Sequence, residues 1–417
     1  MSFSKKATRI CMKKILFISI IITILFFIFY FEFKGSEQPS DPRGYAYVGS
    51  AKCLKCHGDI YNSYLHTAHY TASLPADGNT VHGNFTSGFN VFNVSPSQKI
   101  VMEKHNSGMF QTYYQDGKLK ERHRFDIALG GIKGESYLSW NGNGLNQLPI
   151  SYFTKQNKWL MSPGYAPGIV DFTRIITSRC MECHASYIAD QPAESQKIDA
   201  AEQFDKNSVV YSIDCERCHG PGAKHVEFHT NNPNVKTPIY MISYHSLPRA
   251  LRMDMCGVCH SGNKSQMLRS TFAFKPGNNL SGFKLPDFVR PADSTHLDVH
   301  GNQVQLLESS KCFIKSNMDC ATCHNTHQNQ RGDIALFTQK CLGCHSMVNH
   351  NYCKIATTQN AALIKSNCIK CHMPALLSKV ILISNSNQTS TADIYVRSHH
   401  IAIYPQETKK ILLMIGK

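Results

Sequence analysis

Hydrophobic residues follow three different patterns along this chain. A continuous apolar run extends from Ile15 to Phe31 after a basic segment, and its 17 residues reach the lower limit for a membrane-spanning helix. Between residues 81 and 175 apolar and polar residues alternate, and Asp116-Gly117 has the composition of a hairpin turn, so this region is predicted to form β-strands. From residue 176 onward the pattern predicts short helices joined by loops.

Cysteine and histidine residues form a Cys-x-x-Cys-His motif that occurs seven times. This pentapeptide is the attachment signature of c-type haem, and the composition of the chain predicts roughly 0.03 copies by chance. The two thiols and the histidine lie on one side of a helical turn, where the thiols bind the haem vinyl groups and the imidazole ligates the iron. We therefore predict seven covalently bound haem c groups. In chain order, motifs 1 to 7 comprise Cys53, Cys56 and His57; Cys180, Cys183 and His184; Cys215, Cys218 and His219; Cys256, Cys259 and His260; Cys320, Cys323 and His324; Cys341, Cys344 and His345; Cys368, Cys371 and His372.

Other uses of cysteine explain this pattern poorly. Zinc ribbons and disulfide frameworks do not require a histidine after every second cysteine. Outside the motifs, Cys312 and Cys353 are the remaining thiols of the exported part, and the sequence leaves open whether they form a disulfide or stay as two buried free thiols. Cys11 precedes the apolar run and is expected to be an incidental cytoplasmic thiol.

The formal net charge of +15 at first suggests a nucleic acid or an anionic membrane as the partner. Seven haems, with two propionates each, would add roughly −7 to −14 charges, so most of the basic excess is explained as counter-charge for propionates. The Lys and Arg residues also form no patch interleaved with aromatic residues. A nucleic-acid partner is therefore not expected.

The number of motifs per residue limits which folds are possible. A chain of 417 residues can form two or three ordinary domains, but one haem per roughly 55 residues leaves too little peptide for separate cores. We expect a mainly α multihaem cytochrome c fold with long loops and a haem-packed core, plus a small β-rich insertion between motifs 1 and 2. The expected segments are an N-terminal signal anchor (1–34), a linker (35–48), a first haem segment (49–80), the β-rich insertion (81–175) and a six-haem region (176–417).

The N-terminal segment predicts the location of the protein. No Ala-x-Ala-like cleavage site follows the apolar run, which is succeeded by Glu32-Phe33-Lys34-Gly35. This favours an uncleaved signal anchor over a cleaved signal peptide. The basic flank would stay in the cytoplasm and the haem domain would be exported. We therefore expect a protein anchored in the inner membrane with its haems in the periplasm.

Several short sequence segments around the motifs match a known pattern. They are Val48-Gly49-Ser50, CERCHGPGAKH at 215–225, HGNQVQLLESSKCF at 300–313, CATCHNTH at 320–327 and CHMP at 371–374. Together they resemble the bacterial multihaem cytochrome c family that includes the tetrahaem partner of hydroxylamine oxidoreductase and related pentahaem and octahaem enzymes. The resemblance covers roughly residues 48–404 and implies closely packed, mostly bis-histidine haems in a periplasmic redox protein. The Cys-x-x-Cys-Lys site of the pentahaem nitrite reductases is missing.

The resemblance also implies which of the fourteen other histidines bind iron on the distal side. His66 competes with His69 and His400 with His399, and the sequence does not separate these neighbours. His350 is a weaker seventh candidate. The histidines at 82, 105, 123 and 245 are expected at the surface or on propionates. The predicted distal ligands are His69, His225, His229, His300, His327 and His399.

Two functions fit these features. The first is a membrane-anchored periplasmic heptahaem cytochrome that transfers electrons, because bis-histidine iron has no open position for a substrate. Its expected partners are a membrane quinol oxidase module or other cytochromes, and a periplasmic reductase. The alternative is a multihaem oxidoreductase acting on a small nitrogen or sulfur compound at one open-coordination haem. No catalytic residue is predicted from the sequence.

Overall fold

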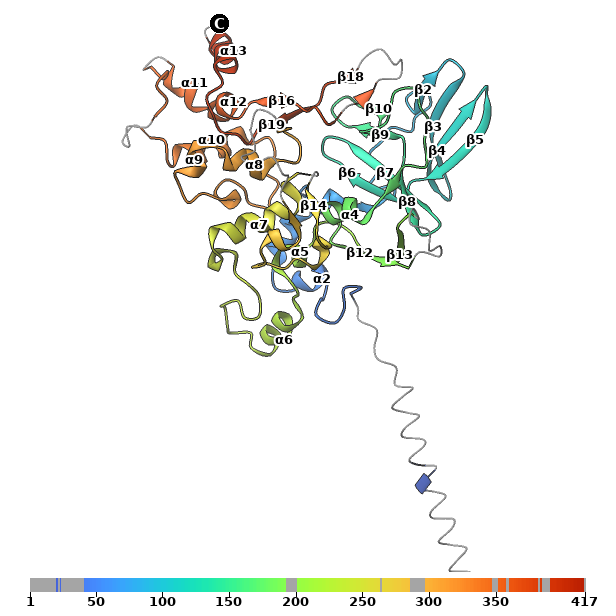
Figure 1. Cartoon of the computed structure of the whole chain (residues 1–417), viewed down its shortest axis with the longest axis horizontal. Coiled ribbons are helices and arrows are strands. Elements are labelled where there is room, and N and C mark those ends of the chain that lie inside the picture. Colours follow the sequence, from blue (N-terminus) through green and yellow to red (C-terminus); the bar gives the residue numbers. More distant parts are fainter. Residues whose placement is uncertain are drawn as a thin grey trace, which may run out of the picture. The chain divides into compact units, whose positions relative to one another are not determined.

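The computed structural model describes most of the chain after residue 40 (Figure 1). The described residues are 20, 21, 23, 41–192, 201–262, 265–285, 297–346, 352–357, 360–381, 383–384 and 391–415. The chain divides into two units, residues 1–40 and 41–417, and the second contains all seven motifs. The predicted anchor lies almost entirely outside the described residues. Within the described part, no helix combines the length and apolar character that a membrane crossing requires.

Two antiparallel sheets occupy the region between motifs 1 and 2. One sheet has seven strands in the order β1-β6-β7-β8-β11, with β9 paired to β7 and β10 paired to β9, and the other has the order β2-β3-β4-β5. Strands β4 and β5 are joined at Asp116-Gly117, where both residues have positive φ angles, as a type I′ hairpin turn requires. The strands are β1 (Leu74–Pro75), β2 (Val91–Ser95), β3 (Gln98–His105), β4 (Gly108–Gln115), β5 (Lys118–Arg124), β6 (Ile127–Gly130), β7 (Glu135–Asn141), β8 (Gly144–Gln147), β9 (Ile150–Phe153), β10 (Lys158–Met161) and β11 (Ile175–Ile176).

These sheets have a peptide core of their own. Alternate residues of β3, such as Ile100 and Met102, are fully buried, as expected for a strand with one face in the core. Aromatic rings fill the centre: Phe125 stacks on Tyr137 with ring centroids 4.2 Å apart, and Trp159 lies edge-on to Tyr152 at 5.1 Å. The β-rich region is therefore stabilised by ordinary side-chain packing.

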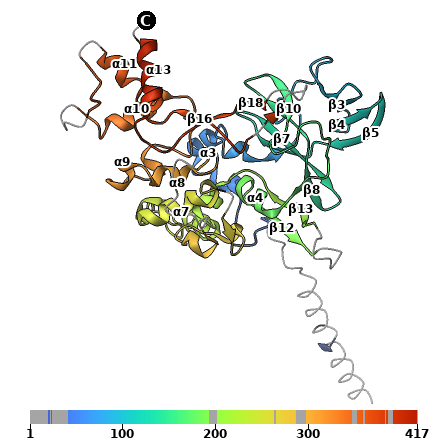
Figure 2. The same cartoon turned by 45° about the horizontal axis from the view of Figure 1, so that its top comes forward.

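The helices of the described chain are short, and most of them carry or flank a motif. Figure 2 shows strands β3, β4, β5, β7 and β8 on one side of the unit formed by residues 41–417, and helices α7 to α11 on the other. The helices are α2 (Ser50–Cys53), α3 (Gly58–Tyr64), α4 (Ser178–His184), α5 (Cys215–His219), α6 (Ala223–Asn231), α7 (Arg249–His260), α8 (Gln303–Glu308), α9 (Lys311–Ile314), α10 (Ile334–Leu342), α11 (Ala361–Lys365), α12 (Cys368–His372) and α13 (Pro405–Ile415). Short 3-10 helices are η1 (Tyr70–Ala72), η2 (Tyr244–Ser246), η3 (Thr271–Ala273), η4 (Leu280–Gly282) and η5 (Cys320–Thr322).

The expectation of a mainly α fold is wrong. Besides the two large sheets, four two-stranded ladders lie in the part that was expected to be helical. An attachment motif needs only one helical turn, so the segments between motifs need not be helical. The backbone N–H and C=O groups of these segments form hydrogen bonds in short two-stranded ladders instead. These strands are β12 (Tyr187–Gln191) with β13 (Gln203–Val210), β14 (Gln266–Met267) with β15 (Lys284–Leu285), β16 (Ala375–Leu377) with β19 (Tyr395–Arg397), and β17 (Ile383–Ser384) with β18 (Thr391–Ala392).

Candidate haem-binding sites

Each Cys-x-x-Cys-His motif is positioned by a single helical turn. Motifs 2, 3 and 7 lie in α4, α5 and α12, motifs 1, 4 and 6 lie at the ends of α2, α7 and α10, and motif 5 begins in η5. Backbone hydrogen bonds close the turns: the amides of His57 and His324 donate to the carbonyls of Cys53 and Cys320 at 2.8 and 2.9 Å. Residues three and four positions apart share one side of such a turn. The thiols and the imidazole of a motif are therefore directed to the same ligand.

Four motif histidines face a second histidine from another part of the chain. The ring centroids are 6.4 Å apart for His57 and His225, 5.9 Å for His219 and His327, 6.3 Å for His260 and His69, and 6.1 Å for His324 and His399. In each pair the first residue belongs to a motif and the second is a predicted distal ligand. The tertiary structure thus places His225 opposite the histidine of motif 1, His327 opposite that of motif 3, His69 opposite that of motif 4 and His399 opposite that of motif 5.

The separation within these pairs fits a haem iron between the rings. A histidine nitrogen binds a first-row metal at about 2 Å, so two imidazoles on opposite sides of one ion have centroids about 6 Å apart. Direct contact between stacked rings would bring them closer. The interplanar angle varies from 15° for His219 and His327 to 70° for His260 and His69. Both orientations are compatible with axial ligation, because each ring can rotate about its metal–nitrogen bond.

The other predicted distal histidines have different surroundings. His300 lies close to His184 of motif 2: burial lowers the pKa of His184, and the charge of His300 contributes to this shift. His229 lies 4.5 Å from His225 between ring centroids, and its Nε2 is buried without a hydrogen-bond partner in the protein. Such a buried nitrogen is suited to bind a metal. His350, the weaker candidate, lies outside the described residues.

Several of these imidazoles are oriented by a backbone carbonyl. The Nδ1 of His372 donates to the carbonyl oxygen of Ala402 at 2.9 Å, and the Nδ1 of His225 donates to that of Ile239 at the same distance. A hydrogen bond at one ring nitrogen fixes the tautomer and leaves the other nitrogen for the metal. The Ala402 contact also shows that the segment carrying His399 reaches motif 7.

Burial favours the neutral form of six of the facing histidines. Desolvation lowers the pKa of His69, His219, His324 and His327 below the usual value, and it lowers the pKa of both His260 and His399 to about 4. The neutral imidazole is the form that binds a metal. The electrostatic environment therefore favours ligation by these side chains.

Thiols of different motifs contact each other in pairs. Cys53 of motif 1 donates a hydrogen bond to Cys215 of motif 3, and this bond together with burial raises the pKa of Cys53. In the same way Cys183 of motif 2 bonds to Cys259 of motif 4. The other thiol of motif 4, Cys256, bonds to Cys320 of motif 5. Haems attached at these paired thiols would lie close together, with the edge of one near the edge of the next.

Further contacts connect the remaining motifs. The bond to Cys320 and burial raise the pKa of Cys256, and Cys218 of motif 3 adds to this shift, so motif 3 is also near motif 4. Burial raises the pKa of Cys341 in motif 6 to about 12, with contributions from Cys368 of motif 7 and Cys323 of motif 5. Motif 1 therefore lies next to motif 3, motif 4 lies next to motifs 2 and 5, and motif 6 lies near motifs 5 and 7, while Arg217 also joins motif 3 to motif 2.

Among the described residues, the two cysteines outside the motifs lie near different motifs. Burial raises the pKa of Cys312, and Cys344 of motif 6 adds to the shift. Cys353 contributes to the raised pKa of Cys368 in motif 7, where burial is the main cause. Both are free thiols in the structure, so the disulfide that the sequence left open is not formed there.

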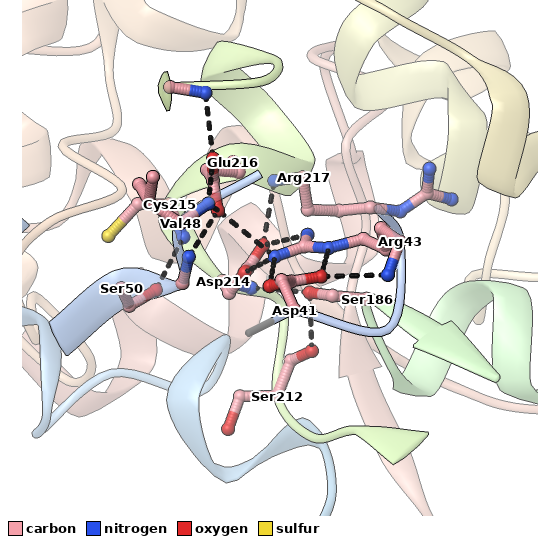
Figure 3. Close-up of polar contacts among 12 residues, drawn as sticks. Asp41, Arg43, Val48, Ser50, Ser186, Ser212, Asp214, Cys215, Glu216 and Arg217 are labelled. Carbon is pink, nitrogen blue, oxygen red and sulfur yellow. Dashed lines mark hydrogen bonds and ion pairs between the residues drawn. The ribbon is translucent and has the colours of Figure 1, made fainter. Parts of the chain in front are cut away.

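Charged residues inside and beside the motifs form buried contacts that the sequence reasoning did not include. The guanidinium of Arg217, between the cysteines of motif 3, donates to the carbonyls of Thr271 at 2.6 Å and Glu182 at 3.1 Å, and Glu182 lies inside motif 2. Figure 3 shows Arg43 among the carboxylates of Asp41, Asp214 and Glu216. Charged side chains at the variable positions of motifs 2 and 3 were the available signal for these contacts.

The chain is similar to cytochromes in part of its sequence and in its fold. The sequence model of the family described as cytochrome c554 and c-prime matches residues 167–220, which contain motifs 2 and 3. Among solved structures, the chain is similar to the outer cell wall cytochrome OcwA, with a TM-score of 0.53 and 17% identity, over 88% of this chain and 81% of that chain. Both findings support a multihaem c-type cytochrome. No curated protein sequence matches the chain significantly.

For such a cytochrome the expected cofactor is covalently bound haem c. The residues fit this group in three respects: paired thiols on helical turns, imidazole pairs at the separation that an intervening iron requires, and buried ring nitrogens without protein partners. When bound, haem c supplies reversible one-electron chemistry at its iron. The protein residues hold it, orient the axial rings and set the surrounding charge.

Proposed function

We propose that this chain is an exported heptahaem c-type cytochrome that transfers electrons through a row of closely spaced haems. The observation that carries the proposal is the set of four imidazole pairs at 5.9 to 6.4 Å, because each pair would be able to hold an iron between its two rings. Iron with two protein ligands has no position for a small substrate. This holds for motifs 1, 3, 4 and 5, and it favours electron transfer as the chemistry of the row.

The order of the motifs supports transfer over the whole unit. Thiol contacts bring motif 1 to motif 3, and motif 4 to motifs 2 and 5, while motif 6 lies between motifs 5 and 7. Electrons entering at motif 1 would pass motifs 3 and 4 and continue toward motif 7. Motif 4 is the junction of this path, since motif 2 also contacts it. We further propose that the chain belongs to the clan of the tetrahaem partner of hydroxylamine oxidoreductase.

Export and anchoring are part of the proposal. OcwA is titled an outer cell wall cytochrome, which supports an exported haem domain for a chain of the same fold. We infer that residues 15–31 anchor the protein in the inner membrane, from the apolar run and the missing cleavage site. A membrane quinol oxidase module would then be the donor, and a periplasmic cytochrome or reductase the acceptor.

Electron paramagnetic resonance of the resting oxidised protein tests the assignment to electron transfer. We expect almost wholly low-spin iron, because distal histidines fill the axial positions, and negligible turnover of nitrite, hydroxylamine or sulfite. Reduction by a low-potential donor should be fast. A stoichiometric high-spin signal that shifts when nitrite or hydroxylamine is added would instead identify an oxidoreductase with one open haem.

Fractionation of cells that express the full chain tests the anchor. Membrane fractions should retain the covalent haem stain after a high-salt wash, because an apolar helix is not released by salt. A matched chain that carries a cleavable signal peptide in place of residues 1–34 should appear in the soluble periplasmic fraction. N-terminal sequencing of the full-length product that begins near Gly35 would contradict the anchor.

A further inference from the structure

A buried cluster of charges joins the first described segment to motif 3. The guanidinium of Arg43 contacts the carboxylates of Asp41 at 2.9 Å, Asp214 at 2.7 Å and Glu216 at 3.1 Å (Figure 3). Each of the four side chains is at most 6% exposed. We call these four residues the Arg43 cluster. Solvent therefore screens their charges little.

Carboxylates exceed cations in this cluster. Three carboxylates surround a single guanidinium, and the neighbouring cation Arg217 bonds instead to the carbonyls of Thr271 and Glu182. Burial raises the pKa of the Glu216 carboxyl, while backbone N–H bonds from Gly222 at 2.7 Å and Gly49 at 2.8 Å and the charge of Arg43 oppose this rise and stabilise the ionised form. The cluster therefore places net negative charge in a buried position.

This charge lies beside the attachment sites of two motifs. Glu216 is inside motif 3, and Asp214 caps helix α5 by accepting the Arg217 amide at 2.7 Å. Glu216 also accepts the Gly49 amide at 2.8 Å, directly before helix α2, which ends at Cys53 of motif 1, and the Cys215 amide donates to Ser50 Oγ of α2 at 3.2 Å. The field of the cluster thus reaches both motif 1 and motif 3.

We propose that the Arg43 cluster sets the haems of motifs 1 and 3 to a lower reduction potential than the same sites would have without it. Ferric haem carries one more positive charge than ferrous haem, so nearby buried negative charge stabilises the oxidised state. On the proposed function, which this inference presupposes, a low potential at the start of the row favours onward transfer toward motif 4. In this proposal, the charges of Glu216 and Asp214 adjust the reduction potentials of the two haems.

Spectroelectrochemical titration of the full holoprotein tests the proposal with the variant Glu216→Gln. This change removes one negative charge and keeps the shape of the side chain and an oxygen acceptor. We expect one or two haems to become about tenfold easier to reduce, which corresponds to an upward shift of about 59 mV for a one-electron couple. The other haems should keep their potentials. The matched control is Glu227→Gln, an exposed carboxylate on α6, which should shift none of them.

The sign of a second substitution separates tuning from a structural role. Arg43→Gln removes the cation and should lower the potentials of the same haems, whereas local disorder would not reverse the direction between the two variants. If Arg43→Gln does not mature, Asp41→Asn replaces it and should shift the same haems upward by less than Glu216→Gln. Unchanged potentials in Glu216→Gln with its haem content intact, or shifts of equal sign in Glu216→Gln and Arg43→Gln, would overturn the proposal.

The outcome is separable from that of the proposed function. A high-spin, substrate-sensitive haem in the unmodified protein would refute the electron-transfer assignment and would leave the titration shifts of these variants as they are. Conversely, a wholly low-spin protein whose potentials ignore Glu216 would refute the tuning role alone.

Discussion

Replacing Cys256 and Cys259 by serine should remove the haem of motif 4 and lower the fraction of the remaining haems that are reduced rapidly. The two thiols contact Cys183 of motif 2 and Cys320 of motif 5, so their loss removes the group between the neighbours on either side. Tunnelling over the longer gap is slower. Intact mass spectrometry should first show seven haem adducts in the unmodified protein and six in the variant.

The measurement uses a ruthenium photosensitiser attached through Lys236→Cys, an exposed position that follows α6, in a background whose remaining free thiols are replaced by serine. Continuous photoreduction of the unmodified protein should reduce all haems in one fast phase. In the motif 4 variant we expect the fast phase to lose motifs 5, 6 and 7, whereas motif 2, which Arg217 joins to motif 3, can still be reduced. The matched control is Cys368→Ser with Cys371→Ser, which removes a haem at the end of the row. A fast phase that reduces every remaining haem in both variants would contradict the proposal that motif 4 is the junction of the path.

Replacing His225 by alanine should convert one haem, about one-seventh of the iron, from low spin to high spin. His225 faces His57 at 6.4 Å, and its loss leaves the iron of motif 1 with a single protein ligand. Electron paramagnetic resonance measures the change directly. Imidazole added to the solution should bind the open position and restore the low-spin signal.

The control for this prediction is His245→Ala, which removes an exposed histidine on η2 that was expected at the surface. It should leave the spin state of every haem unchanged. A low-spin spectrum in the His225→Ala variant with its haem content intact would show that another side chain ligates motif 1. His229, whose ring lies 4.5 Å from that of His225, would then be the first residue to replace in the double variant.

The seven attachment sites were predictable because their chemistry is local. Two thiols and an imidazole within five residues, as in Cys215–His219, share one helical turn whatever the rest of the fold does. The hairpin at Asp116-Gly117 was predictable for the same reason, since both residues tolerate the positive φ angles that the turn requires. The helical content was overestimated, because the segments between attachment sites satisfy their backbone groups in ladders such as β12-β13 and β16-β19.

Assignments that join distant parts of the chain depended on the tertiary structure. The resemblance selected His69 and His399 as distal candidates, yet only the fold pairs them with motifs 4 and 5, over separations of 191 and 75 residues. The spatial order of the motifs, in which motif 3 follows motif 1 and motif 2 lies beside motif 4, has no local signal either. Arg43 and Glu216 give a further example, since their contact joins residues 173 positions apart.

The sequence by itself determined what can be attached and where along the chain, because covalent attachment depends on residues within one helical turn. The tertiary structure decided which histidine faces which motif, which motifs are neighbours, and which charges are buried beside them. These properties depend on how loops and ladders bring distant segments together. Segments such as the one carrying His399 and Ala402 contact two motifs at once, so their position reflects the packing of the whole unit rather than any local preference.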